Sequence, residues 1–386
     1  MLVITHFNQI NLLKANNILM QHFHQQLEAI AKKINFMESR RIKFGKFLRK
    51  INDDFKIGPN EEILDVQIIN QVSDEFPDRV SVLGVDGGIV KHSYHGLDLI
   101  LMRATGVNFI YNQGKLEKAN YYPSSNPLSI PKMLMGSFSD NELNSCYNFE
   151  RQTMEIQATI DAIKKMKPEV VFLDGSVIPH YVNKPDNQEL KKYYKDMIEK
   201  YKELFEVVKK QGIILSGIIE DSRGVKFCDI LNRRVMSHMG SELAKELKQI
   251  LDKTKDSNLL FYVLKKGERT CIFNYSKNPG IHPILKEFEK LQDSFFSFYI
   301  KTVEFDRPIR VDFINFGNPL EITNKLSSIL MKTSGHAGYG LPAVLIEADQ
   351  RAKLSDKDID MFYSDLVRRV GNISSLFKMR REMRPF

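Results

Sequence analysis

The stretch Val80-Ser81-Val82-Leu83-Gly84-Val85-Asp86-Gly87-Gly88 combines an apolar run with a carboxylate and two glycines. A second stretch, Val170-Val171-Phe172-Leu173-Asp174-Gly175-Ser176, repeats this pattern. β-Branched and aromatic runs of this length, bounded by glycine, are typical of strands inside a sheet. If the two strands are neighbours, their ends lie about 4.8 Å apart. Asp86 and Asp174 would then be close enough to require a divalent cation or a proton between them.

The glycines beside the two aspartates have two interpretations. Each Asp-Gly pair by itself would be an ordinary turn. Beside a metal, the absence of a Cβ at Gly87, Gly88 and Gly175 would instead let a bulky phosphate backbone come close. Because the whole pattern occurs twice, it favours a site at the ends of two strands.

The composition is that of a globular protein without a disulfide framework. With 386 residues, 42% hydrophobic and 27% charged, the chain is long enough for one large α/β domain with additions or for two domains. Its three cysteines are far apart and form no C-x-x-C motif, so a cysteine zinc site is not supported. This cysteine usage predicts a cytoplasmic protein.

Charge and hydropathy indicate the kind of partner. No apolar run reaches the roughly 18 residues of a membrane span, and the amino terminus lacks the features of a secretory signal. We therefore expect a soluble protein with no membrane partner. The net charge of +8 favours a polyanion such as nucleic acid.

Residues 1–78 predict a helical N-terminal extension or arm, because apolar residues recur there at steps of three and four. A basic face around Phe44 and Phe47 would fit a phosphate backbone. The alternative is a solvated helix face above a small apolar core. The main domain is expected over residues 79–372, followed by a basic tail over residues 373–386. The basic face consists of Arg40, Arg41, Lys43, Lys46, Arg49 and Lys50.

The order of elements after the Asp86 strand predicts a mixed sheet. An antiparallel meander extends to residue 122, and a helix over residues 140–165 leads into the Asp174 strand. The alternation of strands and helices that follows favours parallel crossovers. The further expected elements are a loop over 123–131, a helix over 187–210 capped by Gly212, a strand over 213–219, a helix near 233–251, strands near 259–264, 270–275, 297–305 and 310–316, a helix over 318–331, and a helix opened by Pro342.

This order is the opening of the ribonuclease-H-like fold. The predicted fold class is therefore α/β, with a ribonuclease-H-like mixed sheet flanked by helices and an N-terminal helical extension. The active site of that fold is a set of carboxylates that holds two divalent ions, because hard oxygen ligands suit Mg²⁺ and Mn²⁺. Two ions about 3.5–4 Å apart can orient a water and stabilise a leaving oxygen. Phosphodiester hydrolysis is the predicted chemistry.

A third ligand is expected from the helix before the Asp174 strand, where Glu150 and Glu155 are the candidates. Glu155 is preferred because it shares a helix face with Ala158 and Ala162, whose small side chains would let that face approach the sheet. Glu150 lies near the helix start, where an acid complements the helix dipole. A solvent-facing glutamate is the plain alternative for either residue.

The stretches around Asp86 and Asp174, the helix with Glu155 and the late stretch over residues 340–352 together resemble the NurA nuclease family, over roughly residues 80–354. The resemblance implies a Mn²⁺-dependent nuclease, with Mg²⁺ as the alternative ion and two ions in the site. It also implies action on single strands and ends of DNA. A homodimer that works with a HerA-type hexameric ATPase in DNA end resection and double-strand-break repair is implied as well.

The resemblance also assigns residues. Asp86 and Asp174 match the metal-binding aspartates of the family, Glu155 matches its glutamate, and Asp349 would be a fourth acidic ligand. All four are therefore predicted catalytic residues. The predicted substrate contacts are Gly87, Gly88, Gly175, Ser176, Arg223, His336 and Tyr339.

Two positions depart from the family pattern. Leu341 stands where the family carries a tyrosine, and Tyr339 lies two residues earlier. Glu220 to Arg223 occupy the place after the middle strand where a lysine is expected, which leaves Arg223 or Lys226 to contact phosphate.

Two other functions fit parts of the sequence. A catalytically silent DNA-binding or assembly subunit would keep the fold without the chemistry, and the displaced Tyr339 motivates this hypothesis. An actin-like ATPase shares the strand-Asp-Gly opening but needs nucleotide-binding glycine loops. The chain has no G-x-x-x-x-G-K-[ST] motif, so any motor activity must come from a partner.

Overall fold

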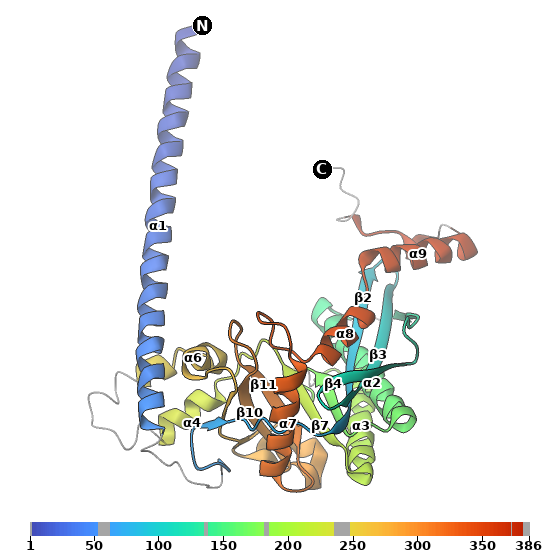
Figure 1. Cartoon of the computed structure of the whole chain (residues 1–386). Helices are drawn as coiled ribbons and strands as arrows, with labels where there is room; N and C mark the ends of the chain where they lie inside the picture. The colour runs from blue at the N-terminus through green and yellow to red at the C-terminus, as the bar shows by residue number, and fades with distance from the viewer. Residues whose placement is uncertain are drawn as a thin grey trace. The chain divides into compact units, whose positions relative to one another are not determined.

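The computed structural model describes residues 2–52, 62–134, 138–180, 185–234, 248–371 and 373–380 (Figure 1). The chain forms two compact units. Unit 1 comprises Met1–Phe55 and Arg223–Val263, and unit 2 comprises Lys56–Ser222 and Leu264–Phe386. None of the described helices combines the length and the apolar character needed to cross a bilayer. The domain boundaries expected from the sequence at residues 79 and 373 stay a prediction. Sequence periodicity does not tell which distant segments pack together.

Unit 1 is built on one long helix, α1 (Leu2–Ile51), with α4 (Lys226–Arg234) and α6 (Asp256–Val263). The Tyr262 hydroxyl donates to Glu38 Oε2 at 2.7 Å and ties α6 to α1. The region over 259–264 was expected to be a strand, and that prediction is wrong. Its buried residues Leu259, Leu260 and Val263 follow helical spacing, and a short apolar run does not distinguish a buried helix from a strand.

The basic face of α1 supports the plainer of its two interpretations. Phe44 is buried and Phe47 half-buried, so neither ring is freely available for stacking on bases. Arg49 Nη1 donates to the Val263 carbonyl at 2.8 Å. Further towards the N-terminus, an apolar stripe at three- and four-residue steps is exposed, made of Met20, Phe23, Leu27, Ile30 and Ile34.

Unit 2 contains a mixed sheet whose described strands follow the order β1-β8-β10-β11-β7-β6-β2-β3-β4, with β5 beside β3 and β9 beside β10. β2, β6 and β7 run parallel, and the other pairs are antiparallel. The predicted mixed α/β fold is confirmed. The strands are β1 (Ile69–Gln71), β2 (Arg79–Ser93), β3 (Asp98–Asn112), β4 (Lys115–Tyr122), β5 (Ile130–Leu134), β6 (Val170–Asp174), β7 (Ile214–Ile219), β8 (Glu268–Thr270), β9 (Phe273–Asn274), β10 (Phe295–Lys301) and β11 (Ile309–Ile314).

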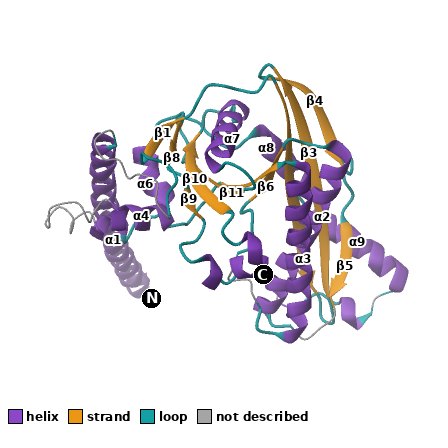
Figure 2. Cartoon of the chain, turned by 90° about the horizontal axis from the view of Figure 1, so that it is seen from below, coloured by secondary structure: helices purple, strands orange, loops and turns teal. Residues whose placement is uncertain are grey.

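Helices cover both faces of this sheet, which explains why β6 is an unbroken apolar run. Leu83 and Val171 face the core beneath α2 and α3, two helices that lie side by side (Figure 2). Val82 and Phe172 face the opposite core, beneath α7 and α8. The helices of unit 2 are α2 (Asp140–Met166), α3 (Gln188–Gln211), α7 (Pro319–Thr333), α8 (Ala343–Ala352) and α9 (Asp356–Val370), with 3-10 turns η3 (Pro279–Ile281), η4 (Leu285–Leu291) and η5 (Ser374–Leu376).

Local signals account for the helix ends. A capping box of Ser139 and Glu142 starts α2, and the Asn187 side chain caps α3. Gly212 ends α3 with a φ of 66°, as predicted for a glycine C-cap. α2, α3 and α7 agree with the predicted helices within two residues, and α8 begins directly after Pro342, as predicted. Of the helix expected over 233–251, residues 235–247 lie outside the described residues, and α4 begins earlier, at Lys226.

Two other predictions of local structure are wrong. β2 does not end at Asp86 but continues to Ser93, because it pairs with β3 along its whole length. The expected loop over 123–131 gives way at Ile130 to β5, which pairs with the outer half of β3. The segment that follows Asp86 is therefore a strand of a long hairpin and not a turn.

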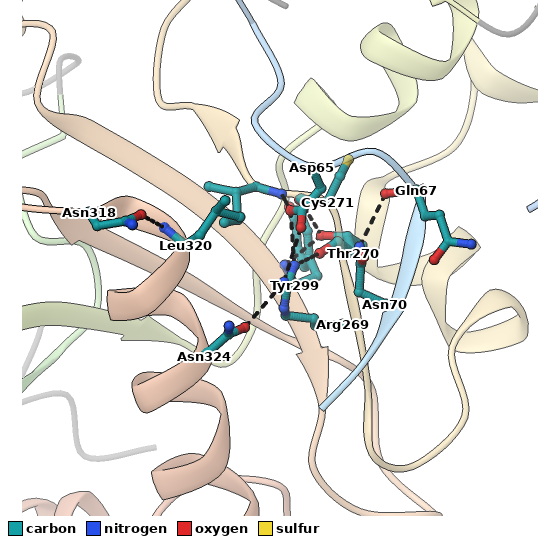
Figure 3. A network of polar contacts seen from close by, with 11 residues as sticks. Asp65, Gln67, Asn70, Arg269, Thr270, Cys271, Tyr299, Asn318, Leu320 and Asn324 are labelled. Carbon is teal, nitrogen blue, oxygen red and sulfur yellow. Dashed lines mark hydrogen bonds and ion pairs between the residues drawn. The ribbon is translucent and has the colours of Figure 1, made fainter. Parts of the chain in front are cut away.

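The expected helical character of residues 62–76 is also wrong, because this segment joins the sheet. β1 pairs with β8, and the Asp65 carboxylate anchors the segment (Figure 3). Its two oxygens accept from Arg269 Nη1 and Nη2 at 3.0 and 3.1 Å. Asp65 Oδ2 also accepts from the Ile272 N–H at 2.6 Å. This buried pair, Asp65–Arg269, needs groups far apart in sequence, so local periodicity cannot predict it.

Candidate active site

Asp86 and Asp174 lie at adjacent positions on neighbouring parallel strands. The register of β2 and β6 pairs Val85 with Leu173, so the next residue on each strand is the aspartate. The predicted adjacency is confirmed. β6 ends at Asp174 while β2 continues, so beyond Asp86 none of the described strands pairs with β2 on this side. The Asp86 side chain is buried and Asp174 is exposed.

The pKa values of both aspartates are raised above the ordinary value of an aspartate. Loss of hydration among the surrounding side chains, together with the charges of Asp86 and Glu220, raises the pKa of Asp174 to about 7. Loss of hydration also raises the pKa of Asp86, and the charge of Asp349 acts in the same direction. Carboxylates that destabilise one another in this way are expected where a cation binds.

α2 brings Glu155 to the same place. Its carboxylate is buried and accepts from Arg151 Nη1 at 2.8 Å. Burial, with the charges of Asp86 and Asp174, raises the pKa of Glu155 to about 8. The glycine at position 87 makes this approach possible, since a Cβ there would lie 3.1 Å from Glu155 Oε2.

The alternative candidate, Glu150, is held elsewhere by an ion pair with Lys132 on β5. Ala158 and Ala162 are buried, as the argument for Glu155 requires. A Cβ on Gly106 of β3 would lie 3.2 Å from the Ala162 Cβ, so α2 sits close against the sheet. Of the two glutamates, Glu155 is the one that the fold brings to the aspartates.

α8 contributes Asp349 from the opposite face. The helix lies almost on the β2 backbone, because a Cβ at Gly84 would be 2.8 Å from the Val344 carbonyl oxygen and one at Gly88 2.0 Å from that of Ala352. This packing alone requires glycine at position 88. The expected substrate contact at Gly88 stays a prediction. The charge of Asp349 acts on both Asp86 and Asp174.

Two further residues, Glu220 and Tyr339, belong with these carboxylates. The Tyr339 hydroxyl donates to Glu220 Oε1 at 3.1 Å. Burial, this hydrogen bond and the charges of Asp349 and Asp174 raise the pKa of Tyr339 to about 12. We call Asp86, Glu155, Asp174, Glu220 and Asp349 the acidic cluster. In the sequence, Glu220 stands out only as a departure from the family pattern, although it directly follows β7 and the carboxyl ends of parallel strands meet at one edge.

The turn after Asp174 is fixed from beneath by a buried polar network. The Ser176 hydroxyl donates to Asp312 Oδ2 at 3.0 Å. Ser297 Oγ and Arg310 Nε each donate to Asp312 Oδ1 at 2.7 Å. The turn also lies directly on Gly217 of β7, where a Cβ would be 2.4 Å from the Gly175 carbonyl oxygen. Ser176 therefore helps to hold the turn that carries Asp174.

The remaining predicted contacts differ in their surroundings. Gly175 has a φ of +92°, and none of the described residues lies within 4 Å of the position of a Cβ, so they leave this side of the turn open. His336 is exposed and accepts from the Gly338 N–H at 3.2 Å within its own loop. Arg223 and Lys226 belong to unit 1, and a phosphate contact by either stays a prediction.

The family profile of the NurA domain matches residues 80–354. The chain belongs to the NurA nuclease family. The match begins at the β2 strand and ends just after α8, so it spans the whole acidic cluster. The expected family is thus confirmed, and the mixed α/β sheet flanked by helices agrees with the expected fold class. No curated protein matches the sequence.

Solved NurA structures share the fold. The NurA nuclease from Sulfolobus solfataricus is 16% identical, with a TM-score of 0.50 over 88% of this chain and 96% of that chain. Another NurA structure is 11% identical, with a TM-score of 0.51 over 91% and 99%. A NurA structure bound to dAMP and manganese is 14% identical, with a TM-score of 0.50 over 92% and 99%.

The acidic cluster suits a hard divalent cation in its chemistry. Carboxylate oxygens are the ligands that Mn²⁺ and Mg²⁺ prefer, and the mutually raised pKa values of Asp174 and Glu155 identify a site short of positive charge. Among the residues that the structure describes, no three such side chains are already arranged around one point as ligands. One oxygen of Glu155 is held by Arg151. Closing on an ion therefore requires side-chain rotation, which the exposed Asp174 and Asp349 permit.

Proposed function

We propose that this NurA-family protein is a metal-dependent DNA nuclease that hydrolyses phosphodiester bonds, both within single strands and from DNA ends. The observation that carries the proposal is the acidic cluster, in which β2, β6, β7, α2 and α8 each direct one carboxylate to the end of β6. A relative solved with dAMP and manganese supports a nucleotide substrate and Mn²⁺ as the ion.

Asp86, Glu155, Asp174 and Asp349 would hold a pair of ions. When bound, divalent cations supply the positive charge that orients an attacking water and stabilises the charge on the phosphoryl oxygens. The sheet register fixes Asp86 beside Asp174, and the Ser176–Asp312 hydrogen bond holds the turn behind Asp174. Tyr339, His336 and the open side of Gly175 would contact the DNA strand, together with Gly87, Gly88, Ser176 and Arg223.

A cleavage assay on a single-stranded oligonucleotide with Mn²⁺ tests this function. We expect the wild type to cleave, and Asp86→Ala and Asp174→Ala to lose at least a hundredfold in rate. Asp365→Ala is the control, because Asp365 is an exposed residue of α9 paired with Arg368. DNA binding without cleavage by the wild type would favour the catalytically silent subunit, and equal cleavage by all variants would place the activity outside this cluster.

We further propose that the protein acts as a homodimer with a HerA-type hexameric ATPase in DNA end resection and double-strand-break repair. The family membership supports this role, and the absence of a nucleotide-binding glycine loop from the sequence means that a partner would supply the motor. Sedimentation of the purified protein, alone and with such an ATPase, should give a dimer and a larger complex. A monomer that stays separate from the ATPase would contradict both parts.

A further inference from the structure

Arg151 is a cation placed among the carboxylates of the acidic cluster. It lies on α2, one helical turn before Glu155, and its charge lowers the pKa of Asp86, Glu155 and Asp174 alike. Its own pKa is raised by the charges of Glu155 and Asp86, against the opposing effect of burial. No signal in the sequence analysis pointed to this residue.

The contacts of Arg151 fix one end of its guanidinium. Nη1 donates to Glu155 Oε2 at 2.8 Å and to the Gly87 carbonyl oxygen at 3.2 Å. A side chain at position 87 would disturb this arrangement, since a Cβ there would lie 3.5 Å from the Arg151 Cγ. Within the described part of the chain, no hydrogen bond to protein is assigned to Nε or Nη2, and 29% of the Arg151 side chain is exposed. The guanidinium is thus anchored through one nitrogen, and part of the side chain is exposed to solvent.

The remaining donors of Arg151 are better suited to binding an incoming anion than to a simple ion pair with Glu155. A guanidinium presents five N–H donors in a planar fork that matches two oxygens of a phosphate. A lysine would satisfy Glu155 equally well as a charge but would offer no fork. The residue directly after β7 is the acid Glu220, so the end of that strand adds a negative charge beside Asp174. The neighbouring turn is open at Gly175.

We propose that Arg151 is a catalytic residue whose guanidinium, held by Glu155 and Gly87, contacts the non-bridging oxygens of the scissile phosphate. This assignment rests on the proposed nuclease function and names a residue for the phosphate contact that Arg223 or Lys226 was expected to make. It predicts that Arg151 recognises the phosphate group itself and not the base or the sugar.

The test compares dAMP with deoxyadenosine, two probes that differ only in the phosphate. Calorimetric titrations with Mn²⁺ present are made on the wild type, Arg151→Gln and Arg151→Lys. We expect Arg151→Gln to bind dAMP about tenfold more weakly or worse, as for a lost charge-assisted hydrogen bond. Deoxyadenosine should bind the wild type and Arg151→Gln alike. Arg79→Gln is the matched control, because Arg79 is an exposed arginine at the far end of β2, about 23 Å along the strand from Asp86.

Mn²⁺ affinity separates this role from a structural one. Removal of a cation from among carboxylates should leave Mn²⁺ binding of Arg151→Gln unchanged or tighter, whereas loss of a clamp on Glu155 would weaken it. Weaker Mn²⁺ binding would therefore overturn the proposal. Arg151→Lys keeps a charge beside Glu155 and should fold with an unchanged melting temperature, and full dAMP affinity in this variant would also overturn the proposal.

The nuclease function is read out separately, from cleavage by the wild type. If the wild type cleaves DNA and binds dAMP while Arg151→Gln binds dAMP equally well, the phosphate contact is wrong and the nuclease function stands. If the wild type neither cleaves nor binds dAMP, both proposals are overturned. Weak dAMP binding and slow cleavage by Arg151→Gln, with a normal Arg79→Gln, support both.

Discussion

Two groups of charged side chains in unit 2 differ in how far their charges are compensated by neighbouring residues. In the Asp65–Arg269 pair, each carboxylate oxygen accepts from the guanidinium, and Arg269 also donates to the Thr270 carbonyl and reaches Asn324 (Figure 3). In the acidic cluster, the charge of Arg151 acts on Asp86, Glu155 and Asp174 together, and the pKa of Asp174 still rises to about 7. The first group is complete within the chain, whereas under the proposed function the second would be completed by bound cations. Imbalance of buried charge, more than burial itself, distinguishes a site from a structural contact.

The sharpest way to break the balanced pair is Asp65→Asn. This change leaves Arg269 buried without its counter-charge, and the loss of one partner of a buried pair costs about 3–5 kcal/mol of unfolding free energy. Urea unfolding should show this loss. Asp74→Asn is the control, because Asp74 is exposed and pairs with Lys332 at the surface. Equal stability of the two variants would mean that the pair contributes nothing to the fold.

In the acidic cluster, the corresponding loss of one carboxylate should reduce activity more than stability. Glu155→Gln removes an acid that lies with Asp86 and Asp174, and we expect cleavage with Mn²⁺ to fall at least a hundredfold, about 2.7 kcal/mol in the activation barrier. Glu150→Gln, on the same helix but paired with Lys132, should cleave at the wild-type rate. The reverse outcome would make Glu150 the third acid and would separate Glu155 from the chemistry.

The contact of α8 with β2 connects fold and site, and Gly88→Ala tests it. The new Cβ would lie 2.0 Å from the Ala352 carbonyl oxygen, so the end of α8 must move. Overpacking of this kind costs about 1–3 kcal/mol, and the shift of Asp349 should slow cleavage as well. Gly317→Ala has nothing within 4 Å of its Cβ and should change neither property. Normal activity in a destabilised Gly88→Ala would show that Asp349 is not needed.

The smallest effect is expected in the network beneath the turn. Ser176→Ala removes one donor to Asp312, whose other oxygen still accepts from Ser297 and Arg310, so a loss of about 1 kcal/mol follows. Cleavage should slow only severalfold, because the turn remains packed on Gly217. Ser145→Ala is the control in denaturation and cleavage, because Ser145 is a half-buried residue of α2 whose hydroxyl donates only to the Asn141 carbonyl of its own helix. A Ser176→Ala variant with full stability and no activity would instead indicate a direct substrate contact.

Much of the site followed from local patterns. The repeated apolar run followed by Asp-Gly predicted that Asp86 and Asp174 would lie side by side if the two strands were neighbours, and the register of β2 and β6 places them so. The small residues Ala158 and Ala162 correctly indicated the face of α2 that approaches the sheet. Arg151 was missed because it interrupts no pattern, and Glu220 stood out only as a departure from the family pattern. The significance of both appears only beside the other acids. The wrong strand at 259–264 and the wrong helix at 62–76 share another cause, because a short apolar run fits whichever partner buries it.

The sequence by itself determined the parallel strands, the position of the first two carboxylates and the family, since these depend on residues close together in the chain. Only the tertiary structure decided that α8 lies on the glycines of β2, that Glu220 meets Tyr339, and that Arg151 stands among the acids. Those contacts join segments separated by up to several hundred residues. Their geometry depends on the packing of whole helices against the sheet, and no local propensity records it.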